Sequence, residues 1–506
     1  MSEKLQNNKK LTTIPLALMC VTSVFMFANI PRGFFLMGYS AIPWYLLAAV
    51  TFFVPFALMI AEYGAAFKDE KGGIYSWMEK VLGAKYAFIT IIMWYVGWLV
   101  WVILTCSSIW IQVSTIIFGK DTTSTWSFLG LSSGQMIGLL AVLFAIALTF
   151  VATKGLDKII KVTTVGGLSV AFINIVAYVG AIIALIAHHG QMAQPITMQA
   201  FTQSPNSNYL SFVSVISFVA FSIVAYGGIE VVGGVADQTE NPEKTFPKGV
   251  LIGAAFIAIA YALGIFAVGM FTNWNAILSG KNVNMANAAI VVMINLGNYI
   301  GTGFGMSQAS SLLLGAWVGR FVALSMFLTY VGALVTVSYS PLKQIIEGTP
   351  KEMWPGKMGQ VDDGIPKNAM WVQCIIMIIF IILVSFGGQG ANAFFNKLVI
   401  MTNVAMTLPY MFITFAFPKF KKNKSIKKPF EIYKTYKSAL IWAIISTLTV
   451  GFANFFLIIQ PATVGDMSTT IWTIAGPVVF AIMSLLLYAR YERIVKFKKI
   501  NKDINA

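Results

Sequence analysis

Charged side chains are scarce in this sequence: Asp, Glu, Lys and Arg make up only 11% of its 506 residues, whereas 58% are hydrophobic. The mean hydropathy is +0.77. A chain of this composition is too apolar for a soluble domain. Its long charge-free runs are long enough to cross a bilayer as helices. We therefore predict an all-α integral membrane protein.

Residues with metal-binding or nucleophilic chemistry are also few. The sequence has three cysteines and two histidines. The cysteines, Cys20, Cys106 and Cys374, each fall inside an apolar run, and their spacing fits neither a metal site nor a disulfide framework. The polar residues inside the apolar runs form no triad, metal cluster or phosphate-binding loop. We expect no enzymatic activity, no metal and no cofactor.

Charge-free windows of about 20 or more residues predict twelve spanning helices. They lie near 14–38, 42–66, 86–118, 132–153, 162–187, 209–236, 248–271, 307–340, 367–386, 395–417, 438–460 and 468–490. The window from Asn282 to Gly319 is too long and too polar at its start to be one span, so we predict that residues 286–303 form a surface helix in an outer loop.

The basic residues are distributed unevenly along the chain. Thirty of the 35 Lys and Arg residues fall in three kinds of segment. These are the tail 1–13, the loops that follow the even-numbered spans, including the loop 418–437, and the tail 491–506 with its adjoining Arg490. Basic segments stay on the cytoplasmic side, so both termini are predicted to be cytoplasmic in a multi-pass protein of the bacterial cytoplasmic membrane. The net charge of +16 then indicates contact with anionic lipids rather than with nucleic acid.

The sixth span is interrupted by AYGGIE at 225–230. Gly227 and Gly228 weaken the helix, and Glu230 is an expensive charge at membrane depth. Such features are typical of a helix that lines a cavity. We predict that the first half-helix ends near Ala225, where open carbonyls, with Tyr226 beside them, favour a cation. The alternative is a kinked packing helix in which Glu230 is a buried, neutral hydrogen-bonding group.

The first span contains a second interruption, at Asn29–Gly33. Pro31 disfavours a helical conformation at Ile30 and suits the first turn of a new half-helix. The amides of Arg32, Gly33 and Phe34 are then expected to point into the break and favour an anion.

Together the two breaks provide amides for a carboxylate and carbonyls for an ammonium group, as an amino-acid site requires. They lie five spans apart in helices of opposite direction. This placement predicts two inverted repeats of five spans, within 14–187 and 209–417, separated by an outer loop at 188–208. Spans 11 and 12 follow at 438–490. Paired interruptions of this kind indicate an alternating-access transporter.

Three charged residues lie in or near spans. Arg32 needs a nearby anion, which is either Glu230 or the substrate, unless its side chain extends outward and contacts neither. Glu230 is a candidate for proton coupling. Glu62, in AEYG at 61–64, is either a hydrogen-bonding or gating residue or a proton carrier.

Other side chains have weaker patterns. Trp94, Tyr95, Trp98 and Trp101 follow helical spacing and either line a pocket or pack against neighbours or lipid. Tyr330 is a candidate for lining the pocket. Lys158 and Lys161, at the start of the fifth span, are either simple positive-inside residues or occupy a position that mimics a bound cation.

These motifs resemble the amino acid–polyamine–organocation superfamily and, within it, the glutamate:GABA antiporter family. The similarity rests on FANIPRGFFLMGYSAIPWY at 27–45, AEYG, GGIYSWMEKVLG at 72–83, AYGGIE and YSPLKQIIEGTP at 339–350. The resemblance implies a LeuT-type fold of twelve spans that exchanges amino acids or takes them up with protons. It places substrate contacts at Ile30, Arg32 and Gly33 and at Ala225–Gly228, and gating or pH sensing at Glu230.

This chain departs from its relatives at the first break, where they often have small residues and it has Pro31 and Arg32. The substrate of the relatives therefore does not transfer unchanged. Arg32 favours a neutral or anionic amino acid over a polyamine. The alternatives are sodium symport, for which Ser325 and Thr329 would contribute oxygen ligands, and a membrane sensor or channel on a transporter scaffold.

Overall fold

The structure is a computed structural model that describes residues 11–70, 73–154, 156–362, 365–387 and 391–504. The described residues are helical and form no sheet; they contain three isolated β-bridges. The α-helices are α1 (Thr13–Val24), α2 (Asn29–Met37), α3 (Ala41–Ala48), α4 (Val54–Ala66), α5 (Ile74–Leu82), α6 (Ala84–Phe118), α7 (Ser133–Ala152), α8 (Leu156–Ala187), α9 (Met198–Thr202), α10 (Phe212–Ala225), α11 (Pro242–Phe271), α12 (Trp274–Ile277), α13 (Ala288–Gly303), α14 (Gln308–Gly348), α15 (Lys367–Ser385), α16 (Ala391–Lys422), α17 (Tyr436–Thr463) and α18 (Met467–Ile504).

Short 3₁₀ and π-helical segments interrupt or join several of these helices. They are the 3₁₀ segments η1 (Gly38–Ser40), η3 (Thr123–Thr125), η4 (Ser207–Tyr209), η5 (Ile229–Gln238) and η6 (Lys351–Met353), and the π-helical segment η2 (Ala49–Phe53).

Ten helical segments of the described chain are long and apolar enough to cross a membrane. Shorter apolar helices include Thr13–Val24 and Ala288–Gly303. Large apolar side chains cover the outer surface of the bundle, for example Leu168 on α8 and Leu486 on α18, which are 70% and 66% exposed. Such a surface is unfavourable in water and favourable against lipid chains. The prediction of a helical integral membrane protein is therefore confirmed.

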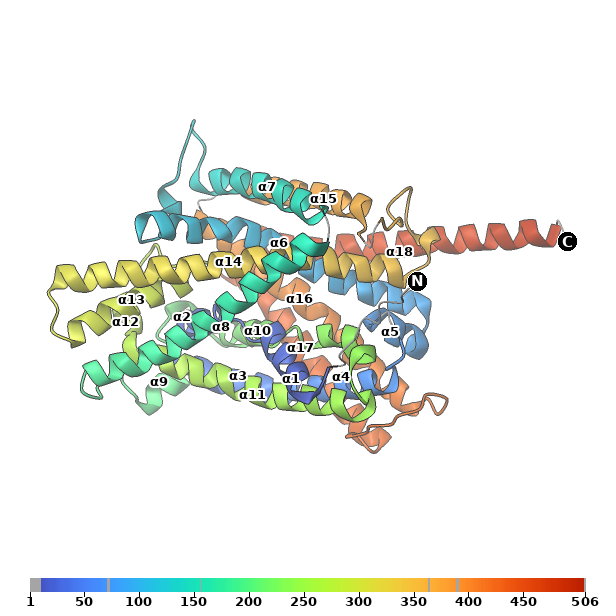
Figure 1. The fold of residues 1–506 in the computed structure, drawn as a ribbon, viewed down its shortest axis with the longest axis horizontal. Coiled ribbons are helices and arrows are strands. Elements are labelled where there is room, and N and C mark those ends of the chain that lie inside the picture. Colours follow the sequence, from blue (N-terminus) through green and yellow to red (C-terminus); the bar gives the residue numbers. More distant parts are fainter. Residues whose placement is uncertain (1–10, 71–72, 155, 363–364, 388–390, 505–506) are drawn as a thin grey trace, which may run out of the picture.

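The long helices run along one direction, with α6, α14 and α16 inside the bundle and α7 beside α15 at one edge (Figure 1). Helix α14 packs on α13, α8 and α6, and α1 packs on α11. The helix α5, the loop between α16 and α17 and the projecting end of α18 lie at one end, whereas α9, α12 and α13 lie at the other (Figure 1). The basic junctions therefore gather at a single end of the bundle.

The helix predicted at 286–303 is present as α13. One side of it is buried, including Ile290, Met293 and Leu296, and packs against α14, α8 and α2. It therefore covers α2, the second half of the broken first span. The three cysteines are buried free thiols, as their apolar context predicts.

Candidate functional site

The first span is broken at Phe25–Ala28, between the end of α1 and the start of α2. The predicted position, Asn29–Gly33, is therefore wrong by about one helical turn. Ile30 and Arg32 are already helical, and their amides donate to the carbonyls of Phe27 and Ala28. Pro31 does lie in the first turn of α2. A proline there removes no helical hydrogen bond, so the helix can begin before it.

The amides free to meet a ligand at this break are those of Phe27 and Ala28. No hydrogen bond is recorded for either within the part of the chain that the structure describes, whereas the Met26 amide donates to the Tyr261 hydroxyl at 3.1 Å. Phe27 and Ala28 precede the N-terminus of α2, where unpaired amides and the helix dipole favour an anion. The unpaired amides of this break thus lie at Phe27 and Ala28 and not at Arg32–Phe34 as predicted.

The sixth span ends its first half where the sequence predicts, because α10 stops at Ala225. Gly228 then adopts a φ of 113° before η5 begins at Ile229. A Cβ atom on Gly228 would lie 2.6 Å from the Ser23 carbonyl oxygen, and one on Gly227 would lie 2.2 Å from the Tyr410 hydroxyl. Only glycine fits this close approach between the two broken spans.

The carbonyls at the end of α10 are not open to a cation, contrary to the prediction. Those of Ser222 and Ile223 accept the Tyr226 amide, and that of Val224 accepts the Gly227 amide. The remaining carbonyl, of Ala225, lies 2.8 Å from the Tyr261 hydroxyl. The last carbonyls of a helix have no partner within the helix itself. Here the following turn and the Tyr261 side chain provide hydrogen-bond donors to them.

Tyr261 of α11 joins the two breaks, and the sequence analysis did not identify it. Its hydroxyl accepts from the Met26 amide and lies 2.9 Å from the Val24 carbonyl and 2.8 Å from the Ala225 carbonyl. Since a hydroxyl has a single proton, it donates to one of these carbonyls at a time. A buried tyrosine in an apolar span needs a polar partner, and this was the available signal.

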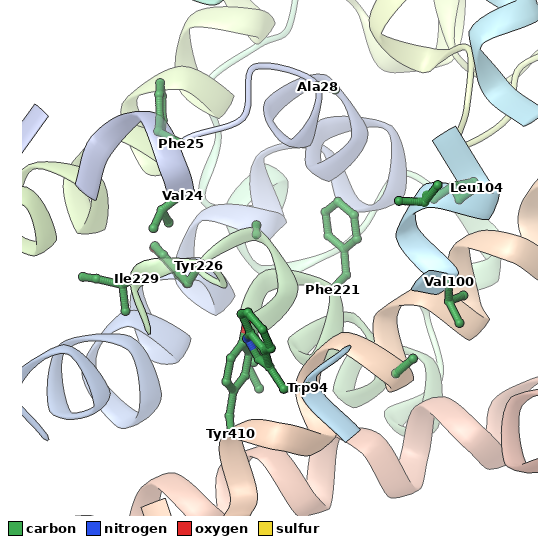
Figure 2. Packing of buried hydrophobic residues seen from close by; sticks show 14 of the residues in the cluster. Val24, Phe25, Ala28, Trp94, Val100, Leu104, Phe221, Tyr226, Ile229 and Tyr410 are labelled. Carbon is green, nitrogen blue, oxygen red and sulfur yellow. The ribbon is translucent and has the colours of Figure 1, made fainter. Parts of the chain in front are cut away.

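Glu230 is 2% exposed and accepts two hydrogen bonds, from the Trp94 indole N–H at 3.2 Å and from the Gly228 amide at 3.1 Å. Figure 2 shows Tyr226, Ile229, Trp94 and Tyr410 gathered around this second break. The carboxyl group therefore fixes the glycine turn to α6. It is held by neutral donors and not by a cation among the described residues.

Arg32 and Glu230 do not pair. The Arg32 guanidinium donates through Nε to the Met285 carbonyl at 2.7 Å, in the segment before α13, and lies beside the Tyr330 side chain. Because Arg32 lies inside α2, one turn beyond the break, it faces α13 rather than α6. The hypothesis that the two charges form an intramembrane ion pair is wrong for this conformation.

Glu62 lies away from both breaks, near the end of α4. It accepts from Lys421 Nζ and from the amides of Ile432 and Tyr433, each at 2.8 Å. The Lys421 and Glu62 side chains are 3% and 0% exposed, and Lys421 also contacts Glu431 at 2.6 Å. This arrangement attaches the loop after α16 to α4, a contact that fits a structural hydrogen-bonding group.

A cavity of about 300 Å³ lies against the first break. Its described lining is Thr22, Ser23, Phe25, Met26, Phe27, Ala28, Trp94, Trp98, Trp101, Ile173, Val231, Met326, Thr329, Tyr330, Ala333, Thr336, Val337, Ser340, Pro341 and Gln344. Trp94, Trp98 and Trp101 thus line a pocket, whereas Tyr95 of the same helix donates to Gln373 instead.

The predicted substrate-binding residues divide into two groups. Tyr330 lines the cavity and Phe27 and Ala28 bring the first break to it. Asn29, Ile30 and Gly33 lie elsewhere on α2: the Asn29 carbonyl accepts from Tyr45, and a Cβ on Gly33 would contact the Tyr45 ring. From the sixth span, Val231 lines the cavity and Ala225–Gly228 lie behind it. The side chains of Lys158 and Lys161 lie outside the described residues.

Comparisons with known proteins identify the family of the chain. The profile of the family described as "Amino acid permease" matches residues 11–483. The chain is 48% identical over 491 residues to the "Inner membrane transporter YjeM" of Escherichia coli, which covers 96% of this chain and 98% of that protein. It is 25% identical to the "Aspartate/glutamate permease AcaP" of Lactococcus lactis, with 87% of each chain covered. It is 22% identical to the "Glutamate/gamma-aminobutyrate antiporter" of the same species, with 88% and 83% covered.

These relatives carry the names of transporters, permeases and antiporters and not of enzymes. The match to the family covers most of the chain, including both breaks and the cavity. The chain belongs to the amino acid permease family, within the amino acid–polyamine–organocation superfamily, and is a multi-pass amino-acid transporter of the bacterial inner membrane.

Proposed function

We propose that this protein carries a neutral or anionic amino acid across the membrane by alternating access, as an antiporter or with protons. The observation that supports this most directly is the pair of broken helices, which approach each other through Gly228 and Tyr261 beside a cavity. Broken helices at a midpoint cavity are the usual substrate site of secondary transporters. The names of the permease and antiporter relatives favour an amino acid of the glutamate or GABA type.

The substrate carboxylate is proposed to bind the amides of Phe27 and Ala28. Both amides precede the α2 helix and both residues line the cavity. Tyr330 is proposed to close the site on the side of Arg32. The amino group would be received after a rearrangement at Ala225–Gly228, since the Ala225 carbonyl now lies 2.8 Å from the Tyr261 hydroxyl and the Gly228 carbonyl accepts the Val231 amide.

The topology we propose is a LeuT-type fold of twelve spans, with α1 and α2 as the broken first span and α10 and η5 as the broken sixth. Both termini lie in the cytoplasm. The cavity residues Ser340, Pro341 and Gln344 lie near the end of α14 that is close to the basic junctions. On this topology the cavity leads toward the cytoplasm, so the conformation is inward-facing.

Proton coupling is proposed to act through Glu230. Ionised, this carboxyl accepts from both Trp94 and Gly228, and protonation would remove one acceptor position and loosen the turn. Glu62 is proposed to stabilise the cytoplasmic end through Lys421. The basic segment 418–437 is proposed to contact anionic lipids. Its exposed lysines include Lys419, Lys422, Lys424 and Lys427.

The test is counterflow in proteoliposomes with a panel of labelled amino acids, at two pH values and with or without sodium. We expect exchange of at least one amino acid, greater activity at the lower pH, and no requirement for sodium. A strict dependence on sodium would support symport instead. A protein that passes ions continuously and exchanges no amino acid would support the channel hypothesis.

A further inference from the structure

The cavity beside the first break has an unusually aromatic wall. Trp94, Trp98 and Trp101 succeed one another on a single face of α6, with ring centroids 6.2 Å and 6.1 Å apart in edge-to-face contact. Helix α14 contributes Met326, Tyr330 and Val337, and the break itself contributes Phe25, Met26 and Phe27. Trp98 and Trp101 are half-buried, so part of each ring is free to contact a ligand.

Four of the hydroxyl groups on the cavity wall do not offset its apolar character; the Tyr330 and Ser340 hydroxyls and the Gln344 amide are its further polar groups. The hydroxyls of Thr22, Ser23, Thr329 and Thr336 donate to the carbonyls of Leu18, Cys20, Ser325 and Gly332 of their own helices, at 2.8–3.1 Å. A hydroxyl that has used its proton presents only acceptor lone pairs to a ligand. These four groups therefore disfavour a second carboxylate in the cavity.

Formal charge is also absent from the residues described as lining the cavity. Two intramembrane charges lie behind the lining: Arg32, which donates to the Met285 carbonyl and lies beside Tyr330, and Glu230, which accepts from Trp94 and Gly228. A charged substrate side chain would lose its hydration on entry and meet no opposite charge on the described lining itself, which is costly at membrane depth.

We propose that the amino acid carried has a bulky, uncharged and largely apolar side chain, which packs on Trp98 and Trp101 while its carboxylate meets Phe27 and Ala28. This inference rests on the proposed transport function. Within that proposal it selects a neutral amino acid, and it departs from the glutamate or GABA type that the names of the relatives favour. The volume of about 300 Å³ is at the lower limit of ligand pockets, which suits a single amino acid. Indole faces also attract cations, so a cationic amine is the competing substrate in the test.

The test uses the full-length protein in proteoliposomes and measures counterflow of four groups of labelled compounds. The bulky neutral group is leucine, methionine and phenylalanine; the small neutral group is alanine and GABA; the acidic group is glutamate and aspartate; the cationic group is lysine, agmatine and putrescine. We expect kcat/KM for the bulky neutral group to exceed that for the acidic and cationic groups at least about 10-fold, since a buried side chain of this size contributes more than 1.4 kcal/mol.

Three cavity variants and one control test whether the indole wall causes this preference. In Trp98→Ala, the KM for phenylalanine should rise about 10-fold while the KM for alanine changes less than about twofold, because only the large side chain loses its contact. Trp98→Phe should restore most of the affinity. Ala333→Phe fills the cavity from α14 and should exclude phenylalanine while retaining alanine. Trp110→Phe, on the same helix but outside the cavity, should behave as the wild type.

The outcomes distinguish failure of the proposed substrate class from failure of the proposed transport function. Preferential exchange of glutamate, GABA, lysine or putrescine overturns the substrate class and leaves the transport function standing. Equal effects of Trp98→Ala on phenylalanine and alanine overturn the role of the indole wall. Because the wild-type panel is decisive without any variant, a variant that fails to fold removes nothing from the test. Absence of exchange for every amino acid overturns the proposed function together with this inference.

Discussion

The two helix breaks differ in what their backbones do. At the first break, bulky residues surround two amides without recorded partners, and the segment lines the cavity. At the second, two glycines allow a close approach, the carbonyls of Ser222–Val224 accept backbone amides, and the Ala225 carbonyl shares the Tyr261 hydroxyl with Val24. The first break therefore presents unpaired amides beside the cavity, whereas the second is closely packed.

The largest expected effect comes from Gly228→Ala at the second break. The left-handed backbone costs about 1–2 kcal/mol for a residue with a Cβ atom. The overlap with the Ser23 carbonyl, at 2.6 Å, adds to this because backbone cannot move aside as a flexible side chain can. A combined cost above about 3 kcal/mol lowers exchange more than 100-fold or prevents folding. Counterflow and the melting temperature of the purified protein measure both.

Gly305→Ala is the matched control for this variant. Gly305 also has a positive φ, 73°, but its Cβ would meet no atom within 4 Å. We expect the control to lose stability through backbone strain alone and to retain exchange. If Gly228→Ala were no more damaging than Gly305→Ala, close packing of the two breaks would not be essential.

Tyr261→Phe tests whether the two breaks act together. The variant removes the acceptor of the Met26 amide and the donor to the Val24 and Ala225 carbonyls. Leaving buried polar groups without partners costs about 1–3 kcal/mol, which predicts a 5- to 100-fold loss of exchange and a lower melting temperature.

Tyr178→Phe provides the comparison for Tyr261→Phe, because the Tyr178 hydroxyl makes a single, longer contact with the Ala260 carbonyl at 3.4 Å. It should remain close to the wild type in both measurements. Equal losses in the two variants would show that the bridge between the breaks has no special role.

Glu230→Gln tests whether the carboxyl group at the second break binds the coupled proton. A glutamine oxygen can accept from Trp94 or Gly228, but its NH₂ group then faces the remaining N–H donor. We expect exchange to fall about fivefold, from the loss of about 1 kcal/mol. Transport should also lose its rise toward acidic pH, because the variant binds no proton. The measurement is the counterflow rate between pH 5 and pH 8.

Glu347→Gln serves as the control for this pH profile, since its side chain is 50% exposed at the end of α14. It should keep the wild-type dependence on pH. A Glu230→Gln protein that retained the full dependence would remove Glu230 from proton coupling.

Much of the second break was predictable from the sequence, whereas the first was predictable only in outline. AYGGIE gave the end of α10 at Ala225 because glycines act locally. Pro31 misplaced the first break, since a proline in the first helical turn marks a helix start only to within a turn. The partners of Arg32 and Glu230, Met285 and Trp94, are more than 100 residues away in sequence. No local pattern could identify them.

Arg32→Gln is expected to have the smallest effect and sharpens the contrast between the breaks. The Arg32 side chain donates to the Met285 carbonyl and lies beside Tyr330, behind the cavity lining, so the variant loses a supporting contact rather than a substrate contact. Glutamine can still donate to the Met285 carbonyl. We expect the KM for the preferred amino acid to change less than about threefold, because one partly buried hydrogen bond of this kind contributes about 0.5 kcal/mol net.

A rise of more than about 10-fold in KM for Arg32→Gln, which corresponds to 1.4 kcal/mol, would place Arg32 at the substrate carboxylate during the cycle. Arg32→Lys separates the two cases, since lysine keeps the charge but not the planar donor geometry. If Arg32 binds the substrate as a charge, lysine should restore transport better than glutamine does. If its role is the contact with Met285, both variants should resemble the wild type, and the amides of Phe27 and Ala28 remain the groups that bind the carboxylate.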